Sequence, residues 1–242
     1  MPPCDQDESH TRYSIKALYS QSFRTPNIGV ANNSPIPLKD EFTTTYELEA
    51  GVRLGGGLSL TGNAYHVRIE NLIAYEGSVN RYVNGAPMST EGVELQARFQ
   101  SERIAAYLGY SYNRAVDQGL ALFSAEPALG HLNLNMPAHQ IVWNATWHIT
   151  RALDWNASGT FLSRRAAYAY PDPAAPSILD GEVLLHSHLR YQWHQLDLGV
   201  GVRDLLDRKE VIGQPYNGGT GPLRLSGRTF FAQVGFRFRG DR

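Results

Sequence analysis

The feature that most constrains this fold is an alternation of apolar and polar side chains with a period of two. In segment 42–54, alternate positions such as Tyr46 and Leu48 are apolar apart from one threonine, whereas the positions between them, such as Glu47 and Glu49, are polar or glycine. Because successive side chains of a β-strand point to opposite faces, this pattern predicts a strand with one apolar and one polar face. On a helix the same residues would scatter charge around the whole circumference.

The alternation recurs along the chain and predicts about ten strands. The clearest examples are 13–19, 93–100, 141–149, 155–161, 183–191, 196–203 and 230–238, with noisier strands near 58–75 and 104–116. Several of these exceed the roughly 9–11 residues that a tilted strand needs to cross a bilayer.

The predicted connections alternate strictly between long and short. The long ones are 20–40, 76–89, 117–137, 171–181 and 205–227, and the short ones are 55–57, 101–103, 150–152 and 193–194. An outer-membrane barrel has short periplasmic turns, long external loops and a last strand that ends on the periplasmic side. The pattern therefore predicts an all-β, antiparallel, up-and-down transmembrane barrel. A soluble sandwich or lipocalin-like barrel remains the alternative, because period two alone does not tell the inner face from the outer one.

Composition excludes some classes of protein. The formal net charge of -1 provides no basic field for nucleic acid, so no nucleic-acid partner is expected. Cys4 is the single cysteine, so an internal disulfide is impossible. The chain contains no stretch of about 20 apolar residues, so no transmembrane helix is predicted. A membrane barrel remains compatible with this, because its strands carry apolar residues only at alternate positions.

The expected organisation has three parts. Residues 1–10 form a polar leader, expected to be disordered, without the basic and apolar regions of a secretory signal. Residues 11–238 form the barrel segment, and residues 239–242 form a polar tail.

Seven segments, in this order, resemble motifs of the barrel of TonB-dependent outer-membrane receptors. They are the S-x-F-R-x-P run in 19–27, the Y-E strand in 38–51, the N-x-Y…L-I strand in 63–73, the Y-x-N…G-V-E pair in 82–95, N-x-P-x-H in 135–139, the V-x-x-L-x-D strand end in 202–207 and the closing G-R-x-F in 227–230. Asp40 and Asp204 stand where the family has proline and asparagine, and four polar residues follow Phe238, where the family ends on an aromatic residue.

This resemblance implies the C-terminal part of a 22-stranded barrel with a plugged lumen. The plug, the energy-coupling box and the first strands would lie upstream of Met1. The implied location is the bacterial outer membrane, and the implied function is uptake of a scarce solute such as a ferric siderophore, haem or cobalamin. The implied partners are outer-membrane lipid, the plug, the TonB energy-coupling complex, the barrel-assembly machinery and a small ligand such as an iron complex.

The candidate site residues form two groups. Polar residues expected to face the lumen are Glu47, Glu49, Arg53, Glu94, Arg98, His148, Arg164, Arg190 and Arg203. Residues of the long loops that are candidates for ligand binding are Arg81, Tyr82, His131, Tyr168, Tyr170 and Tyr216. The plainer alternatives are that the first group only hydrogen-bonds water and the plug, and that the loop tyrosines form an interface girdle.

Two other functions remain open, although no catalytic residue, metal site or cofactor is expected. A complete small barrel could be an enzyme with Asp and His at its external rim, where His131, Asp117, Asp172 and Asp180 are available. A binding barrel without transport is the other possibility. His186 and His188 share a strand face, but they have no nearby Cys or carboxylate in sequence to complete a metal site. An isolated half-barrel is expected to fold poorly, because both of its edges would be open.

Overall fold

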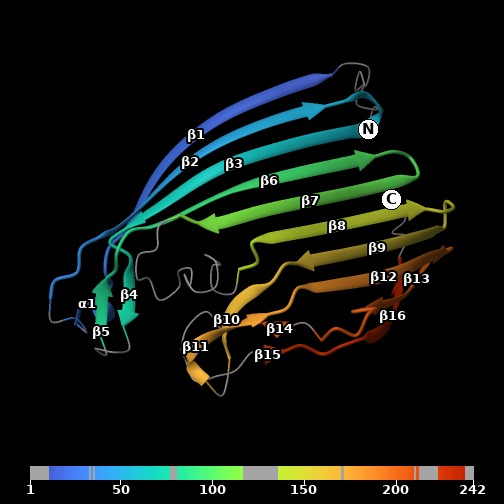
Figure 1. The fold of residues 1–242 in the computed structure, drawn as a ribbon. Coiled ribbons are helices and arrows are strands. Elements are labelled where there is room, and N and C mark those ends of the chain that lie inside the picture. Colours follow the sequence, from blue (N-terminus) through green and yellow to red (C-terminus); the bar gives the residue numbers. More distant parts are fainter. Residues whose placement is uncertain are drawn as a thin grey trace.

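The computed structural model describes residues 11–32, 34, 36–76, 81–116, 136–169, 172–209, 211–212 and 223–237. Its main feature is one ten-stranded antiparallel sheet in the order β1-β2-β3-β6-β7-β8-β9-β12-β13-β16, so each strand pairs with the next long strand of the chain (Figure 1). The strands are β1 (Arg12–Arg24), β2 (Glu41–Arg53), β3 (Leu58–Glu70), β6 (Met88–Gln100), β7 (Ile104–Ala115), β8 (His139–His148), β9 (Leu153–Leu162), β12 (Glu182–Trp193), β13 (Leu196–Arg203) and β16 (Thr229–Phe236). The predicted number and arrangement of strands are confirmed.

The long connections hold structure that the sequence did not predict. They contain a short helix α1 (Ile28–Asn32) and the hairpins β4 (Ile73–Glu76) with β5 (Arg81–Asn84), β10 (Arg165–Ala169) with β11 (Asp172–Leu179), and β14 (Val211–Ile212) with β15 (Leu223–Arg224). Figure 1 shows the hairpins at one end of the sheet, the hairpin end, and the tight connections at the opposite end, the short-turn end. In the described residues, no helix is long and apolar enough to span a bilayer.

Two predicted boundaries were wrong. The first long connection was expected to begin at Ser20, but β1 continues to Arg24 because its pairing with β2 is unbroken to the end. The segment 58–75 was expected to be one strand, but it is divided into β3 and β4. The break lies at Asn71, whose φ of 54° turns the chain out of the sheet.

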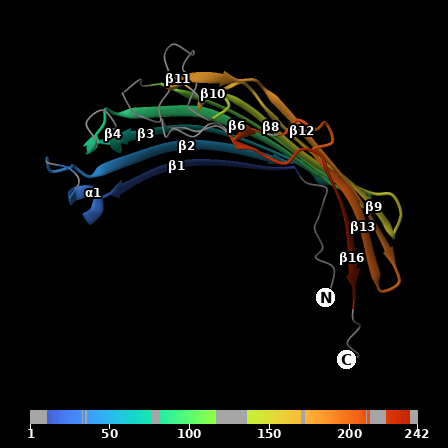
Figure 2. The ribbon, with the colours of Figure 1, turned by 90° about the horizontal axis from the view of Figure 1, so that it is seen from below.

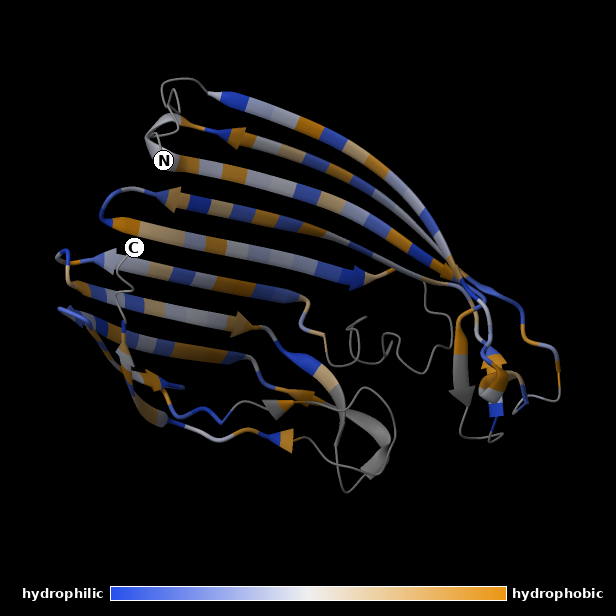
Figure 3. Ribbon diagram, turned by 180° about the vertical axis from the view of Figure 1, so that it is seen from behind, coloured by the Kyte–Doolittle hydropathy of each residue, from blue (hydrophilic) through white to orange (hydrophobic). Residues whose placement is uncertain are grey.

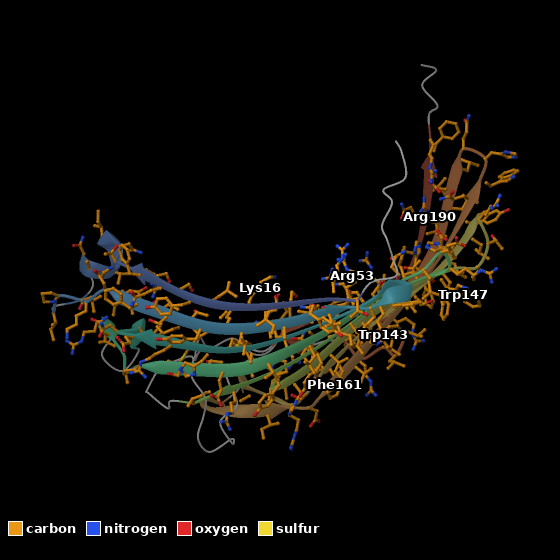
Figure 4. All side chains as sticks on the ribbon, turned by 90° about the horizontal axis from the view of Figure 1, so that it is seen from above. Lys16, Arg53, Trp143, Trp147, Phe161 and Arg190 are labelled. Carbon is orange, nitrogen blue, oxygen red and sulfur yellow. The ribbon has the colours of Figure 1, made fainter. Side chains whose placement is uncertain are left out.

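The sheet curves into an open wall (Figure 2), and its curvature shows which face of the strands is the inner one. Hydropathy alternates along the strands (Figure 3). Lys16, Arg53 and Arg190 point to the concave side, whereas Trp143, Trp147 and Phe161 point to the convex side (Figure 4). The polar face is therefore the inner face of a partial barrel, and the apolar face points outward as in a membrane barrel.

Aromatic side chains mark both ends of the convex face. Near the hairpin end, the rings of Tyr19 and Tyr46 lie 5.3 Å apart. Trp147 and Trp155 are paired residues at the short-turn end of β8 and β9. On β1, Tyr13 and Tyr19 are six positions apart, which corresponds to about 20 Å at 3.3 Å per residue. This height approaches the apolar band of about 25 Å between the aromatic girdles of outer-membrane barrels.

The turn between β2 and β3 depends on two glycines of the 3-10 turn η1 (Gly55–Gly57). Gly56 and Gly57 have φ values of 75° and 83°, which side chains disfavour. A Cβ atom on Gly57 would lie 1.9 Å from the carbonyl oxygen of Gln100, whereas one on Gly56 would meet nothing within 4 Å. The turn thus packs tightly against the end of β6, and only Gly57 lies at the contact.

No register shift interrupts any pairing within the main sheet. Side chains on one face therefore form register rows that cross the strands. One concave row consists of Arg12, Arg53, Ser59, Arg98, Tyr107, Asn144, Ser158 and His186. A second, four residues away along each strand, contains Lys16, Glu49, Asn63, Glu94 and Ser111.

Candidate functional site: the concave face and the hairpin end

Eight of the nine residues predicted to face the lumen belong to strands of the main sheet. Arg53 and Arg190 point to the concave side, and the register rows put Glu49, Glu94 and Arg98 on the same face as Arg53 (Figure 4). The alternation gives Glu47, His148 and Arg203 the same orientation. The ninth, Arg164, is exposed in the link between β9 and β10, so the structure does not place it with the others.

Charged groups on the concave face of the last strands neutralise one another. The carboxylate of Asp197 accepts a bond from Arg190 Nη2 at 3.0 Å and one from Arg237 Nε at 2.9 Å. His148 Nδ1 lies 2.7 Å from Asp154 Oδ1. These groups all lie near the short-turn end, where β8, β9, β12, β13 and β16 meet the tight connections. The sequence predicted His148 and Arg190 but missed both aspartates.

Aromatic rings hold two concave arginines. The guanidinium of Arg98 lies 5.4 Å from the centroid of the Tyr107 ring, and that of Arg203 lies 5.3 Å from the Phe231 ring. His188 also stacks with Phe231, with ring centroids 5.6 Å apart. A cation over a ring face keeps the N–H edge of its guanidinium available to an anion. Close to Tyr107, a depression of about 240 Å³ is lined by Glu94, Gln96, Ser111 and Gln140, among others.

At the hairpin end, an ion pair hydrogen-bonds the backbone of Ile73, the first residue of β4. Glu41, which is 9 % exposed, accepts a bond from Arg24 Nη2 at 2.7 Å and one from the amide of Ile73 at 2.9 Å. Arg24 also donates to the carbonyl oxygen of Ile73 at 3.2 Å. The pair therefore satisfies both polar groups of one peptide residue and holds the hairpin against the ends of β1 and β2.

A second two-point contact holds the other strand of this hairpin. The side-chain amide of Asn84 accepts from Lys39 N at 2.7 Å and donates to Lys39 O at 3.0 Å. Asn84 also donates to Asn71 O at 2.8 Å, and Asn71 donates to Asp40 O at 3.1 Å. We call the contacts of Arg24, Glu41 and Asn84 the hairpin clamp. No motif of the sequence predicts it, because its partners are far apart in the chain and include backbone atoms.

The hairpin clamp holds the hairpin that contains two of the six predicted ligand-binding residues. Arg81 and Tyr82 belong to β5, and both are half-buried. Tyr168 belongs to β10, where it pairs with Pro176. His131, Tyr170 and Tyr216 lie outside the described residues. Arg81 and Tyr82 share one element, but as neighbours in a strand they point to opposite faces of the hairpin.

Asp204 builds the corner that follows β13. Its φ is 49°, and its carboxylate accepts the amides of Arg208 and Lys209, both at 2.9 Å. Its own amide donates to His186 Nδ1 at 3.1 Å. Burial by itself raises the pKa of the Asp204 carboxyl, but the two amides and the nearby cationic groups outweigh it, so the net pKa is lowered.

Comparison with known proteins connects this architecture to one family. The model of the TonB dependent receptor-like β-barrel matches residues 9–205. No protein of curated function matches the sequence.

Solved structures of receptors share the fold at low sequence identity. The ferripyoverdine receptor of the outer membrane of Pseudomonas aeruginosa superposes with a TM-score of 0.74 at 15% identity, over 92% of this chain and 30% of that chain. The ferric-catecholate import receptor Fiu of E. coli gives 0.76 at 18%, over 93% and 33%. The FrpB iron transporter of Neisseria meningitidis gives 0.70 at 15%, over 92% and 36%. The chain spans about a third of the length of these receptors. It belongs to the family of TonB-dependent receptor-like β-barrels.

Proposed function

We propose that this chain forms part of the wall of an outer-membrane receptor that takes up a scarce solute, of the ferric siderophore, haem or cobalamin type. The observation that carries the proposal is the orientation of the sheet, with a polar concave face and an apolar convex face between aromatic ends. Such a wall separates lipid from a polar lumen. The hairpin end supports ligand capture, since the clamp presents Arg81 and Tyr82 on a fixed hairpin.

A clamped hairpin suits ligand binding because little conformational entropy is lost when the ligand arrives. Arg81 offers charged N–H donors, and Tyr82 offers a ring with a polar tip, so both suit a large, polar, anionic chelate. Iron complexes are the first class to test, and three receptors with this fold are described as a ferripyoverdine receptor, a ferric-catecholate import receptor and an iron transporter.

The test is uptake of radioactive iron by cells that carry or lack the gene, with a panel of hydroxamate, catecholate and mixed chelators. We expect uptake of at least one complex to require both the gene and TonB, and to fall in an Arg81→Ala/Tyr82→Ala variant. Arg208→Ala, at a described position on a different connection, is the matched control. Gene-dependent growth on haem or cobalamin without iron-chelate uptake would keep the receptor and change its ligand class. No gene-dependent uptake of any of these solutes would contradict the proposal.

The enzymatic alternative gains no support from the described residues. Of its four candidate rim residues, only Asp180 has a described side chain, and it is exposed beyond β11. No group of three or more His, Cys, Asp or Glu gathers within the described ranges.

A further inference from the structure

The convex face of the first strands contains two neighbouring depressions, of about 510 Å³ and about 560 Å³. The convex residues that line the first, which is nearer the hairpin end, are Ala17, Tyr19, Tyr46, Leu48, Ala64 and His66. The lining of the second includes Ala50, Val52, Leu60, Gly62 and Ala97. From Tyr46 to Val52 the two depressions follow β2 for six positions, or about 20 Å. We call them together the convex groove.

The floor of the convex groove is open because small residues form it. A Cβ atom on Gly62 would meet only the end of the Leu95 side chain, at 3.3 Å, and a backbone oxygen at 4.0 Å. The later strands also have a glycine on the convex face, Gly159, but there a Cβ atom would lie 2.5 Å from Nε1 of Trp143. Trp143 thus covers in β8 and β9 the kind of space that stays open over Gly62 (Figure 4).

An apolar hollow on this face is filled by whatever the membrane supplies, because empty space costs its lining atoms their dispersion contacts. The walls are apolar, and Leu48 and Leu95 are each 54% exposed. The groove follows the strands and so crosses the apolar band from the hairpin end toward the short-turn end. One leaflet accounts for half of a hydrocarbon core of about 30 Å, so a groove of about 20 Å is long enough for one acyl chain.

The two ends of the convex groove differ in polarity. At the hairpin end His66 lines the groove, and Arg68 follows on the same face about 7 Å farther along β3. Arg68 Nε donates to Glu70 at 3.0 Å, and a guanidinium with five N–H donors can bind a further anion. At the other end the row through Val52 continues with Leu60, Ala97 and Leu108, which are all apolar. The groove therefore has the polarity of a lipid whose headgroup lies toward the hairpins.

We propose that the convex groove binds one lipid of the leaflet on the hairpin side, with an acyl chain over Gly62 and the headgroup phosphate at His66 and Arg68. A lipid fits better than a second copy of the chain, because the groove is continuous with the lipid-facing surface and its polarity changes along the direction of an acyl chain. The inference goes beyond the proposed function, since it concerns the outward face and requires no particular solute.

The test measures the lipid that stays with the complete protein when it is purified from its own cells in a mild detergent. Native mass spectrometry is expected to detect a bound, phosphate-bearing lipid. Ala64→Phe/Ala97→Phe fills both depressions, so retention should fall about tenfold as the acyl methylenes lose their contacts. Ala145→Phe/Ala157→Phe adds the same rings to the convex face outside the groove and should retain the lipid.

A second pair of variants tests the headgroup. His66→Gln/Arg68→Gln should lower retention severalfold, whereas Arg114→Gln, on the same face of β7 outside both depressions, should not. Washing with inorganic phosphate should leave the lipid in place, because the acyl chain makes most of the contacts. If the phenylalanine variant fails to form the heat-resistant barrel band on a gel, Gly62→Leu replaces it, since its Cβ meets only the flexible end of Leu95.

Three results would overturn the inference: wild-type protein that retains no lipid, equal losses in the groove-filling variant and its control, or a dimer of this protein that only the groove-filling variant abolishes. Solute uptake is measured in the same cells. Retained lipid without any uptake removes the proposed transport and keeps the lipid site, whereas uptake without retained lipid does the reverse.

Discussion

The wall has two parts, which differ in the length of their strands and in the pairing of their charged side chains. In the first part, β1, β2, β3 and β6 have 13 residues each and β7 has 12, which exceeds what a bilayer requires. In the second part, β8 and β9 have 10 residues and β13 and β16 have 8, although β12 between them has 12. The tall part carries Arg12, Arg53 and Arg98 on one register row and the hairpin clamp, whereas in the short part Asp197 pairs with both Arg190 and Arg237. The two parts therefore differ in height and in how the charges on their concave face are paired.

The largest effect that would sharpen this comparison is expected at the turn of the tall part. Gly57→Ala puts a Cβ atom within 1.9 Å of a backbone carbonyl and forces a positive φ on alanine. The loss of stability is expected to be about 3 kcal/mol or more, because neither backbone can move without breaking a strand pair. The measurement is urea unfolding in lipid vesicles, together with the fraction of protein that forms the barrel band.

Gly56→Ala is the matched control for that turn. Its φ of 75° is also positive, but its Cβ meets no atom within 4 Å, so a loss of about 1 kcal/mol is expected. Equal losses in the two variants would show that strain, and not the contact with Gln100, limits the turn.

Ion pairs at the hairpin end provide the next test, because each part has one whose carboxylate is largely buried. Arg165 and Glu182 in the second part are 2.5 Å apart with side chains 6% and 13% exposed, whereas Arg24 and Glu41 are 59% and 11% exposed. Glu182→Gln should therefore cost about 3 kcal/mol, and Glu41→Gln about 1–2 kcal/mol. The reverse order in unfolding experiments would contradict the view that burial sets the cost.

Glu41→Gln also separates positioning from stability. If the hairpin clamp positions Arg81 and Tyr82, this variant should lower ligand affinity more than maximal uptake, and Glu41→Asp should partly rescue it. Glu182→Gln, which is far from this hairpin, should change stability without that split.

A smaller effect is expected from Asp197→Asn, which makes the short part resemble the tall one. Arg190 and Arg237 then lose their shared anion, so stability should rise with added salt more steeply than in the wild type. All three groups are partly solvated, so the denaturant midpoint of unfolding should hardly move at moderate salt. A large shift of the midpoint at moderate salt would mean that the network is structurally essential.

The smallest effect concerns pH at the corner after β13. The pKa of Asp204 is lowered in the folded protein, so its contribution to stability is present above the ordinary carboxyl pKa of about 4 and is lost as pH falls through the folded value. Unfolding midpoints measured between neutral and strongly acidic pH should show a loss that Asp204→Asn lacks. Parallel pH profiles for the two proteins would exclude this contribution.

The sequence predicts the strands and their faces well because each strand carries its own signal. The alternation of Trp143 and Asn144, for example, needs no knowledge of distant residues. The hairpin clamp could not be predicted in this way, since Glu41 satisfies a backbone amide that is 32 positions away. Likewise, the proximity of Arg12 and Arg53 can be seen only once the register puts them opposite each other. Sequence patterns therefore predict the orientation of side chains here, and pairing is needed to predict which ones meet.

The uninterrupted register of the sheet has a consequence for how distance along the barrel axis is encoded. The row that starts at Arg12, the first residue of β1, reaches His186 in the half of β12 nearer the hairpins, about 23 Å farther along the strand direction than the short-turn end. The register rows therefore run obliquely around the inner surface and rise from strand to strand. A slip of two residues at any tight turn would preserve every inward and outward orientation but raise or lower all later strands by about 7 Å. The alternation of apolar and polar positions does not detect such an error, so the geometry of the tight turns helps to keep the register rows continuous.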